Sequence, residues 1–494
     1  MILEVLIFLL TAIISYYIYS YKRVHSYFKE RDVKYLPGFP FFGNLFYSTI
    51  QKTHAIDDLS EVYDAFPEER YVGFAEMSTP VILVRDPEII KNIIVKDFDH
   101  FTDRRDFFDP ELDPLFSESL FLMKGERWRD MRTTLSPAFT GSKMKFMMPF
   151  ILDIVNNIIE YLNEHQDQDI DLDDLSRRYT NDVIASAGFG MQVNSLQDRD
   201  NEFFTIGSGL FDFNFKQTAA FIITTLIPSL GKLFGYRVFS DRAYEFFPRI
   251  VATAMEYRKK EKIDRPDMIQ LLMETKKEFT LKEMVGQVFI FFSAGYETSA
   301  STIVMTLHEL ALNPDVQDKL YEECKNANLE KLTFENLSEL KYLDAVINES
   351  LRKWTSAPLL DRACTKDYEL PPPREGGKPY TLKRGDGVYN VVNQIHMDPK
   401  YWPEPHKYQP ERFLEENKHK IKPFTYFPFG AGPRICIGMR FAVMEVKALI
   451  YHIIMNFKAV KTAKTMDPIK IKPHNFIVKI LNGSFVRFEK RQTE

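Results

Sequence analysis

Apolar residues recur with a helical period over most of this chain, and only short segments have the pattern of β-strands. The helical period is clearest from Phe146 to about Leu281, where it includes Phe150, Ile151, Ile154, Val155 and Ile158. The apolar run Val81–Val84, set between turn residues, predicts short strands within 71–85, and further β structure is expected in 378–392 and 476–488. The pattern therefore predicts a mainly α protein with small β-sheets, an α+β fold.

The first residues form a separate apolar stretch. Ile2 to Tyr19 is nearly all apolar or aromatic, long enough to cross a bilayer as a helix, and a basic cluster follows it at Lys22, Arg23, Lys29 and Arg31. The positive-inside rule then places the rest of the chain in the cytosol. A cleaved signal peptide is the alternative, and the absence of Lys or Arg before the stretch disfavours it. We expect an anchor at 1–21, a basic and Pro/Gly hinge at 22–44, and one large domain at 45–494.

A second long apolar-periodic segment begins at Thr280. Thr280-Leu281-Lys282-Glu283 has the form of a capping box, and the period continues to Asn313-Pro314. One face of this helix should carry Met284, Val288, Phe291, Gly295, Thr298 and Thr302. Glu297 and Thr298 place an acid and a hydroxyl in an apolar environment, which costs free energy unless they are partnered or used. Gly295 and a back-bonding Thr298 are expected to loosen the helix there.

The chemistry that stands out most clearly is at Cys436. This cysteine lies between glycines, directly before an apolar-periodic helix at 439–457. Glycine lets backbone N–H groups approach the sulfur, the helix N-terminus adds partial positive charge, and Arg434 is expected to add a full one. The segment therefore predicts a thiolate site; a buried structural cysteine beside a turn is the simpler alternative.

Composition narrows the function classes. The 494 residues contain no repeat or Gly/Ser linker, and a net charge of −5 without a basic, aromatic-interleaved block argues against nucleic-acid binding. Cys324, Cys364 and Cys436 are widely spaced, which is typical of a reducing compartment. The 42 phenylalanines suggest an aromatic-walled cavity.

The loop around Cys436 resembles the haem-ligand loop of the cytochrome P450 family, Phe-x-x-Gly-x-Arg-x-Cys-x-Gly. The matching positions are Phe429, Gly432, Arg434, Cys436 and Gly438. The segment 294–299 is similar to the oxygen-activation segment of that family. The resemblance covers essentially the whole chain, and 101–105, 133–144 and the anchor are most similar to microsomal, xenobiotic-metabolising insect members.

The resemblance implies haem b, with Cys436 as the ligand of the iron. The other residues expected to hold the haem are Phe429, Gly432, Arg434, Gly438, Trp128, Arg132, Arg104 and Arg362. Thr298 and Glu297 are the implied catalytic residues, which deliver protons. Glu349, Arg352 and Arg412 match a structural Glu-x-x-Arg…Arg network that supports the loop behind the haem. The implied substrate contacts are Phe107, Phe121, Phe211, Phe291, Ala294, Ala357, Leu360 and Phe476.

Electrons must reach such an enzyme from outside, because the chain has no Gly-x-Gly-x-x-Gly turn that opens a helix and no flavin domain. The resemblance implies an NADPH-cytochrome P450 reductase of the endoplasmic reticulum membrane as donor, so that NADPH acts indirectly, with cytochrome b5 a further candidate partner. The segment Trp354-Thr355-Ser356 departs from the aromatic-Pro-Pro common in the family, and Met397 stands where His is common. These departures affect the expected pocket wall rather than the oxygen chemistry.

Four functions remain open at this point. The first is a monooxygenase of apolar xenobiotics, such as plant toxins or insecticides, and the second is the same reaction on one hormone or lipid. The third is a hydroperoxide isomerase or dehydratase on the same fold, which would need no external electrons. The fourth is a non-catalytic, membrane-anchored haem-binding protein, for which Cys436 would suffice. Glu297 and Thr298 argue against the third, and the Phe-rich segments favour the first over the second.

Overall fold

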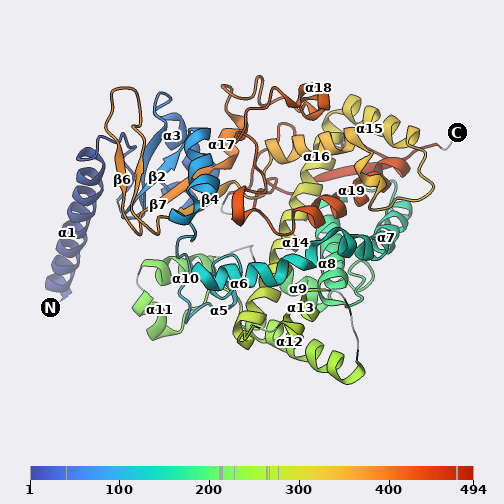
Figure 1. Cartoon of the computed structure of the whole chain (residues 1–494), viewed down its shortest axis with the longest axis horizontal. Helices are drawn as coiled ribbons and strands as arrows, with labels where there is room; N and C mark the ends of the chain where they lie inside the picture. The colour runs from blue at the N-terminus through green and yellow to red at the C-terminus, as the bar shows by residue number, and fades with distance from the viewer. Residues whose placement is uncertain are drawn as a thin grey trace.

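A helical part and a smaller part with a mixed β-sheet make up the molecule, and the long helix α14 (Leu281–Leu312) runs through its middle (Figure 1). The computed structural model describes residues 2–40, 42–210, 215–226, 228–262, 265, 267–275, 277–473 and 477–492. The predicted fold class, mainly α with small sheets, is confirmed.

The helices other than α14 are α1 (Ile2–Lys29), α2 (Phe46–Thr49), α3 (Ala55–Asp64), α4 (Pro87–Lys91), α5 (Pro114–Ser117), α6 (Gly125–Leu135), α7 (Gly141–Glu164), α8 (Leu172–Phe189), α9 (Glu202–Ser208), α10 (Phe215–Leu226), α11 (Pro228–Phe234), α12 (Asp241–Glu261), α13 (Met268–Glu274), α15 (Pro314–Asn326), α16 (Lys341–Lys353), α17 (Val392–Met397), α18 (Glu415–Lys418) and α19 (Met439–Asn456). The strands are β1 (Tyr71–Glu76), β2 (Thr79–Val84), β3 (Ile170–Asp171), β4 (Leu359–Ala363), β5 (Tyr368–Leu370), β6 (Tyr380–Leu382), β7 (Gly387–Val391), β8 (Phe457–Val460) and β9 (Phe485–Lys490).

The largest sheet has the strand order β1-β2-β7-β4. Strands β1 and β2 form the antiparallel pair expected in 71–85, β7 joins β2 in parallel, and β4 closes the sheet antiparallel to β7. In that last pair Leu360 faces Asn390 and Arg362 faces Val388. The sheet thus brings β4 to the helical part of the molecule, where two of its side chains, Leu360 and Arg362, reach the central cavity.

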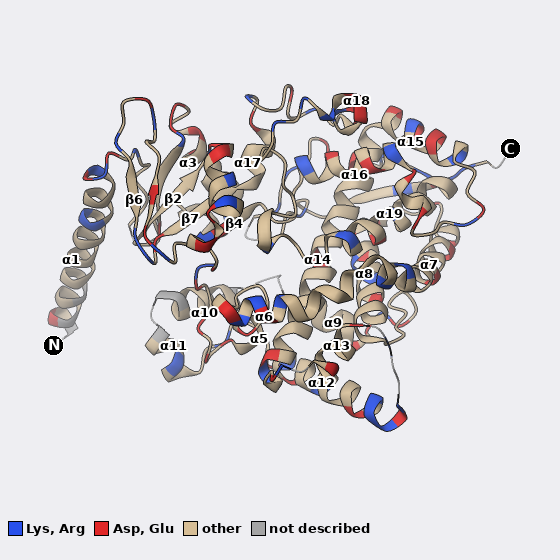
Figure 2. Cartoon of the chain, viewed as in Figure 1, with Lys and Arg blue, Asp and Glu red and all other residues tan. Residues whose placement is uncertain are grey.

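Helix α14 begins and ends where the sequence predicts. The Thr280 hydroxyl accepts the backbone N–H of Glu283 at 3.2 Å, and the Glu283 carboxylate accepts that of Thr280 at 2.7 Å, which completes the capping box. The helix remains regular through Ala294–Ser299, so the expected loosening at Gly295 and Thr298 is not observed. In the ribbon of Figure 2 this helix is mostly in the colour of uncharged residues.

Helix α14 is also long and apolar enough to cross a membrane, yet 78% of its most apolar window is buried inside the protein. It is therefore a core helix. It packs against α8, where the Thr180 hydroxyl donates to the carbonyl of Tyr296 at 2.8 Å.

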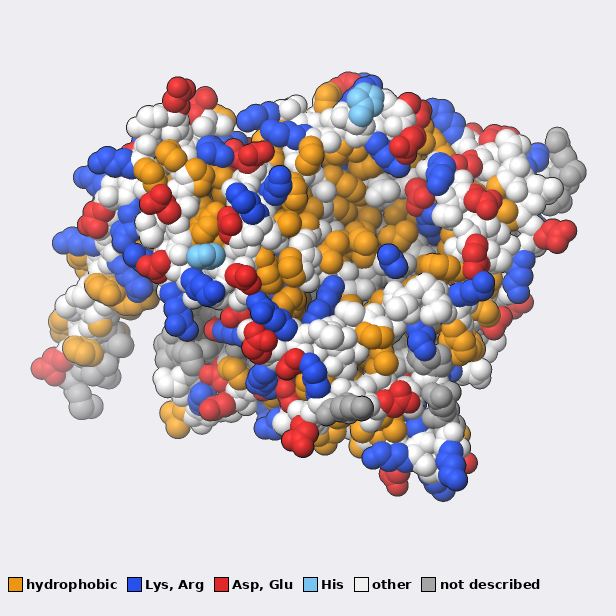
Figure 3. Space-filling view, viewed as in Figure 1, with side chains coloured by type: hydrophobic (Ala, Val, Ile, Leu, Met, Phe, Trp, Pro, Cys, Tyr) orange, Lys and Arg blue, Asp and Glu red, His pale blue; other side chains and the backbone are white. Residues whose placement is uncertain are grey.

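Charged side chains cover much of the molecular surface that faces the viewer in Figure 3. This surface is hollowed across its middle, where hydrophobic side chains are visible.

Helix α1 has no break at residue 21 but continues to Lys29. Its C-terminal end packs on the sheet: Phe28 is fully buried against Gly73 of β1, and the Tyr27 hydroxyl donates to Asp386 at 2.8 Å. Its N-terminal half extends away from the body (Figure 1) and exposes large apolar side chains, among them Leu3, Leu6, Phe8, Leu10, Ile13 and Ile14. One end of this helix is thus docked on the sheet, and the other presents an apolar surface.

Candidate active site

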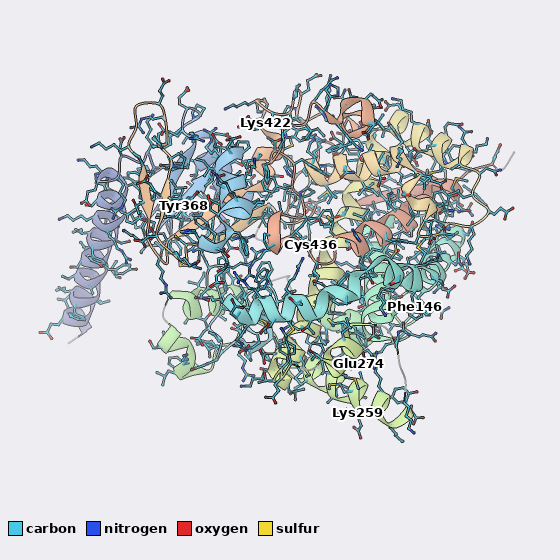
Figure 4. The ribbon with its side chains drawn as sticks, in the orientation of Figure 1. Phe146, Lys259, Glu274, Tyr368, Lys422 and Cys436 are labelled. Carbon is cyan, nitrogen blue, oxygen red and sulfur yellow. The ribbon has the colours of Figure 1, made fainter. Side chains whose placement is uncertain are left out.

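A cavity of about 320 Å³ lies between the middle of α14, the loop before α19, helix α6 and strand β4. Figure 4 places Cys436 near the middle of the molecule, with Lys422 and Lys259 toward its edges. The residues on the cavity wall that the sequence singled out are Arg104, Phe121, Trp128, Arg132, Phe291, Ala294, Thr298, Ala357, Leu360, Arg362, Phe429, Arg434, Cys436 and Gly438. The structure thus brings together, around one space, residues from all four of these segments.

The loop that carries Cys436 depends on two glycines with left-handed backbone. Gly430 and Gly432 both have φ of +71°, and a Cβ on Gly432 would lie 1.9 Å from the carbonyl oxygen of Ile94. The backbone N–H of Cys436 then donates to the carbonyl of Phe429 at 2.9 Å. This turn places Cys436 on the cavity wall, where the residue is exposed.

Burial raises the pKa of the Cys436 thiol, and the backbone N–H groups of Gly438 and Met439 act against that effect, as does the positive charge of Arg132. Arg434, which the sequence predicts to add positive charge here, is held by backbone groups: its guanidinium donates to the carbonyls of Thr102 at 2.6 Å, Phe121 at 3.2 Å and Met123 at 2.6 Å. The sulfur therefore needs a further positive partner, such as a metal ion, to remain a thiolate.

Three arginines form a cationic cluster at one end of the cavity. Arg104 donates to Asp361 at 2.7 Å, whereas Arg362 is 2% exposed and its Nε has no partner among the described residues. Burial, together with the charge of Arg104, lowers the pKa of Arg362 to about 9, and burial with the charges of Arg104 and Arg362 does the same for Arg434. Only two carboxylates, Asp361 and the more distant Asp103 at 3.8 Å from Arg434, offset these charges in the described contacts.

This cluster fits a ligand that carries carboxylates. An unpaired buried guanidinium nitrogen is costly unless an anion completes it, and a dianionic ligand would offset the excess charge. Trp128, on α6, lies on the same wall, and its indole ring stacks with the guanidinium of Arg434 at 4.3 Å. The two propionates of haem b are carboxylates that this arginine cluster would bind, and the sulfur of Cys436 would be the ligand of its iron. The residues present therefore fit the haem that the sequence implies.

The face of α14 toward the cavity carries Phe291, Ala294 and Thr298. The Thr298 hydroxyl donates to the carbonyl of Ala294 at 2.7 Å, so its lone pairs remain free to accept a proton donor from the cavity. Glu297 is not on the cavity wall. It is 1% exposed on another side of the helix, with Arg177 at 3.4 Å and Lys479 at 3.3 Å.

The acid that does reach the cavity wall is Glu445 of α19, which sequence reasoning missed. It is 1% exposed, and the hydroxyl of Ser299 on α14 donates to its carboxyl group. Burial raises the pKa of Glu445 to about 8, with a smaller opposing effect of the Ser299 hydrogen bond. The sequence signal was an acid nine residues after Cys436 within an apolar helix.

The predicted network of Glu349, Arg352 and Arg412 is assembled as expected. Arg352 donates to both oxygens of Glu349, at 2.7 and 2.8 Å, both side chains are fully buried, and Arg412 lies 3.5 Å from Glu349. Arg352 also donates to the carbonyl of His396 at 2.9 Å. The network thereby holds the end of α17 against α16, and the ring of His396 in turn accepts the backbone N–H of Phe427, just before the Cys436 loop.

The expected substrate contacts are partly on the cavity wall. Phe121, Phe291, Ala294, Ala357 and Leu360 line it. Phe107 does not, because its ring lies beside the guanidinium of Arg105 instead, at 6.0 Å. Phe211 and Phe476 lie outside the described residues. Sequence reasoning missed other wall residues, namely Leu120, Phe139, Ile184, Ile290 and Ile347.

The loop 107–121 is tied to helix α12. Asp113 is fully buried and accepts the hydroxyl of Tyr244, from α12, and the backbone N–H of Val238 at 3.1 Å. Nearby, the rings of Phe108 and Phe116 lie 4.8 Å apart, and Phe108 also contacts Phe239. The loop is therefore an ordered wall segment rather than a disordered connection.

Comparison with known proteins gives consistent matches. A family model described as Cytochrome P450 matches residues 33–486. The chain is 38% identical to a probable cytochrome P450 9f2 of Drosophila melanogaster, over 94% of this chain and 95% of that protein. It is 39% identical to cytochrome P450 9b2 of the same species, with 92% and 93% covered. It is 38% identical to cytochrome P450 9e2 of Blattella germanica, with 95% of each covered.

Proposed function

Because this chain belongs to the cytochrome P450 family, we propose that it is a haem-thiolate monooxygenase that inserts one oxygen atom from O2 into an apolar small molecule. The observation that carries the proposal is the cavity in which the sulfur of Cys436 and the hydroxyl of Thr298 both lie, on segments 138 positions apart in the chain. When bound, a haem with a thiolate ligand supplies oxygen activation and O–O cleavage.

The protein residues have separable roles in this proposal. Cys436 holds the iron, and Arg104, Arg132, Arg362 and Arg434, with Trp128, hold the carboxylates of the cofactor. Thr298, on the wall formed by α14, accepts and passes protons. Glu297, on another side of the same helix, has a negative charge that is paired with Arg177 and Lys479. The apolar wall limits the access of water, which would otherwise divert the reaction.

The substrate class follows from the wall. Phe121, Phe291, Leu360 and Ile184 offer an apolar surface with few polar groups, which favours uncharged apolar molecules. We propose xenobiotics, such as plant toxins or insecticides, as the substrates. A dedicated hormone or lipid would use the same wall, and the distinction belongs to the substrate experiment below.

Location and electron supply complete the proposal. The exposed apolar part of α1 supports a single-pass anchor at 1–21, followed by the segment 22–44 and a catalytic domain at 45–494 on the cytosolic side of the endoplasmic reticulum. An anchored enzyme of this kind would receive electrons from NADPH through the cytochrome P450 reductase of the same membrane, with cytochrome b5 as a further donor.

Two measurements test the function. Carbon monoxide added to the reduced full-length protein should give the red-shifted Soret band of a thiolate ligand, and Cys436→Ser should abolish it; an imidazole-like band in the wild type would refute the ligand assignment. Turnover with reductase and NADPH on a panel of apolar compounds should give mono-oxygenated products. Activity on hydroperoxides alone would favour the isomerase instead, and a haem protein inert in both assays would favour the non-catalytic alternative.

A further inference from the structure

The segment between α16 and β4 contacts α14 through the indole N–H of Trp354, which donates to Glu309 at 2.6 Å near the end of the helix, and through Ser356 beside the cavity. The Ser356 hydroxyl lies 3.1 Å from the carbonyl oxygen of Thr298 and 3.2 Å from the hydroxyl of Thr302. The Thr302 hydroxyl in turn donates to the carbonyl of Thr298 at 2.9 Å. These three groups form a closed triangle on the cavity wall, in which Ser356 is 6% exposed and Thr302 is 7% exposed.

The hydrogen positions in this triangle are limited by the number of donors. Each hydroxyl has one hydrogen, and that of Thr302 is used on the carbonyl of Thr298. The hydrogen of Ser356 can then go to that same carbonyl or to the Thr302 oxygen, so two of the three contacts are hydrogen bonds at one time, and in either case Ser356 is a donor to this pair. Ser356 is thus the one contributor from outside α14, so it ties the helix to the segment that follows α16.

That segment also forms the substrate wall, because Ala357 and Leu360 line the cavity immediately after Ser356. We propose that Ser356 is a positioning residue for Thr298, which sets the place of the Thr298 hydroxyl relative to bound substrate by holding the carbonyl of the same residue. This inference rests on the proposed function, since it assigns a role within the same site. It predicts that Ser356 affects how efficiently oxygen is transferred rather than how tightly substrate binds.

The neighbouring residue provides a matched control. Thr355 is fully buried, carries a hydroxyl one position earlier, and its Oγ1 has no hydrogen-bond partner among the described residues. Thr355 is also absent from the cavity wall. Thr355→Val therefore removes a hydroxyl from the same segment without breaking a bond to α14, whereas Ser356→Ala removes the tie, and Ser356→Thr retains a hydroxyl.

The first experiment measures hydrogen exchange by mass spectrometry on the full-length protein without substrate. Loss of one hydrogen bond should raise the exchange rate of backbone amides at 298–303 by about 2- to 10-fold in Ser356→Ala. Ser356→Thr and Thr355→Val should retain the wild-type rate. Equal rates in Ser356→Ala and wild type would overturn the proposal, whether or not the protein is an active oxygenase.

The second experiment measures coupling with the best substrate of the wild type. In Ser356→Ala, product formed per NADPH consumed should fall about 2- to 10-fold and hydrogen peroxide should rise, with KM unchanged. Ser356→Thr should restore the ratio. A change in KM alone would show that Ser356 only shapes the wall and would refute positioning. A wild type without turnover would refute the proposed function, while the exchange rates would still decide whether the tie exists.

Discussion

The ring nitrogen Nε2 of His396 accepts the backbone N–H of Phe427 at 3.0 Å, and both residues are buried. Through this bond the Glu349–Arg352 ion pair, which holds the carbonyl of His396, is connected to the chain two residues before Phe429. Burial and the neighbouring charge of Arg352 lower the pKa of His396 to about 3, so its ring remains a neutral acceptor at physiological pH.

His396→Leu should therefore loosen the Cys436 loop. The substitution leaves the buried N–H of Phe427 without its partner, which costs about 1–3 kcal/mol. We expect a lower haem content per protein and a lower thermal unfolding midpoint. His406, which is exposed, offers the control His406→Leu, which should change neither quantity. Normal haem content in His396→Leu would show that the bond does not support the loop.

Gly432→Ala should prevent haem incorporation. With a Cβ, the left-handed backbone at this position costs about 1–2 kcal/mol. The new Cβ also overlaps the carbonyl of Ile94, which cannot move aside as a flexible side chain could. Gly376 has the same backbone region, φ +72°, with nothing within 4 Å of the added Cβ. Gly376→Ala therefore isolates the backbone cost, and haem content measured in both variants should fall only in Gly432→Ala. Equal losses would mean that the clash is relieved.

Thr298→Val should retain haem while product formation becomes uncoupled from electron flow. The isosteric side chain keeps the packing of the cavity wall but removes the hydroxyl that passes protons, so product per NADPH should fall by about tenfold or more, with hydrogen peroxide released. Thr298→Ser, which keeps the hydroxyl, should remain close to the wild type. An unchanged ratio of product to NADPH in Thr298→Val would refute the proton-delivery role.

Glu445 should make the folded protein less stable as pH rises. Its carboxyl keeps its proton to about pH 8 in the folded state but ionises near the ordinary value of 4.5 in the unfolded chain. Between these values folding takes up a proton, so this group lowers the free energy of unfolding by up to about 1.4 kcal/mol for each pH unit of increase, and above about pH 8 its effect is constant.

The measurement is urea unfolding of the full-length protein in detergent at a series of pH values. Glu445→Gln cannot ionise, so its stability relative to the wild type should grow between pH 4.5 and about 8 and level off above. Glu339→Gln, at an exposed position, should follow the wild-type profile. If the stability of Glu445→Gln and of the wild type changed in parallel with pH, the carboxyl of Glu445 would already be ionised in the folded wild type.

Much of the site could be predicted because its signals are local in sequence. The capping box at Thr280, the glycines around Cys436 and the spacing of Glu349 and Arg352 each describe one turn or one helix face. The loop that holds Arg412 follows by resemblance, since nothing local connects it to α16.

The remainder depends on contacts between distant segments. Ser299 meets Glu445, 146 positions later, only because α14 and α19 pack together, and Ser356 meets Thr298 only because the segment after α16 lies against α14. The direction of the Arg434 side chain is likewise set by carbonyls of 102–123. Phe107 lies in a loop without a hydrophobic period, so the sequence carried no signal for the side to which its ring turns.

The contact between Asp113 and Tyr244 has a kinetic consequence. A molecule that passes between the loop 107–121 and α12 must first separate this buried pair, at a cost of about 1–3 kcal/mol. The barrier is crossed once on entry and once on exit. The rate constants of binding and of release therefore fall by the same factor, about 5- to 150-fold. For a substrate that takes this route, the time spent inside is therefore lengthened while its affinity is unchanged.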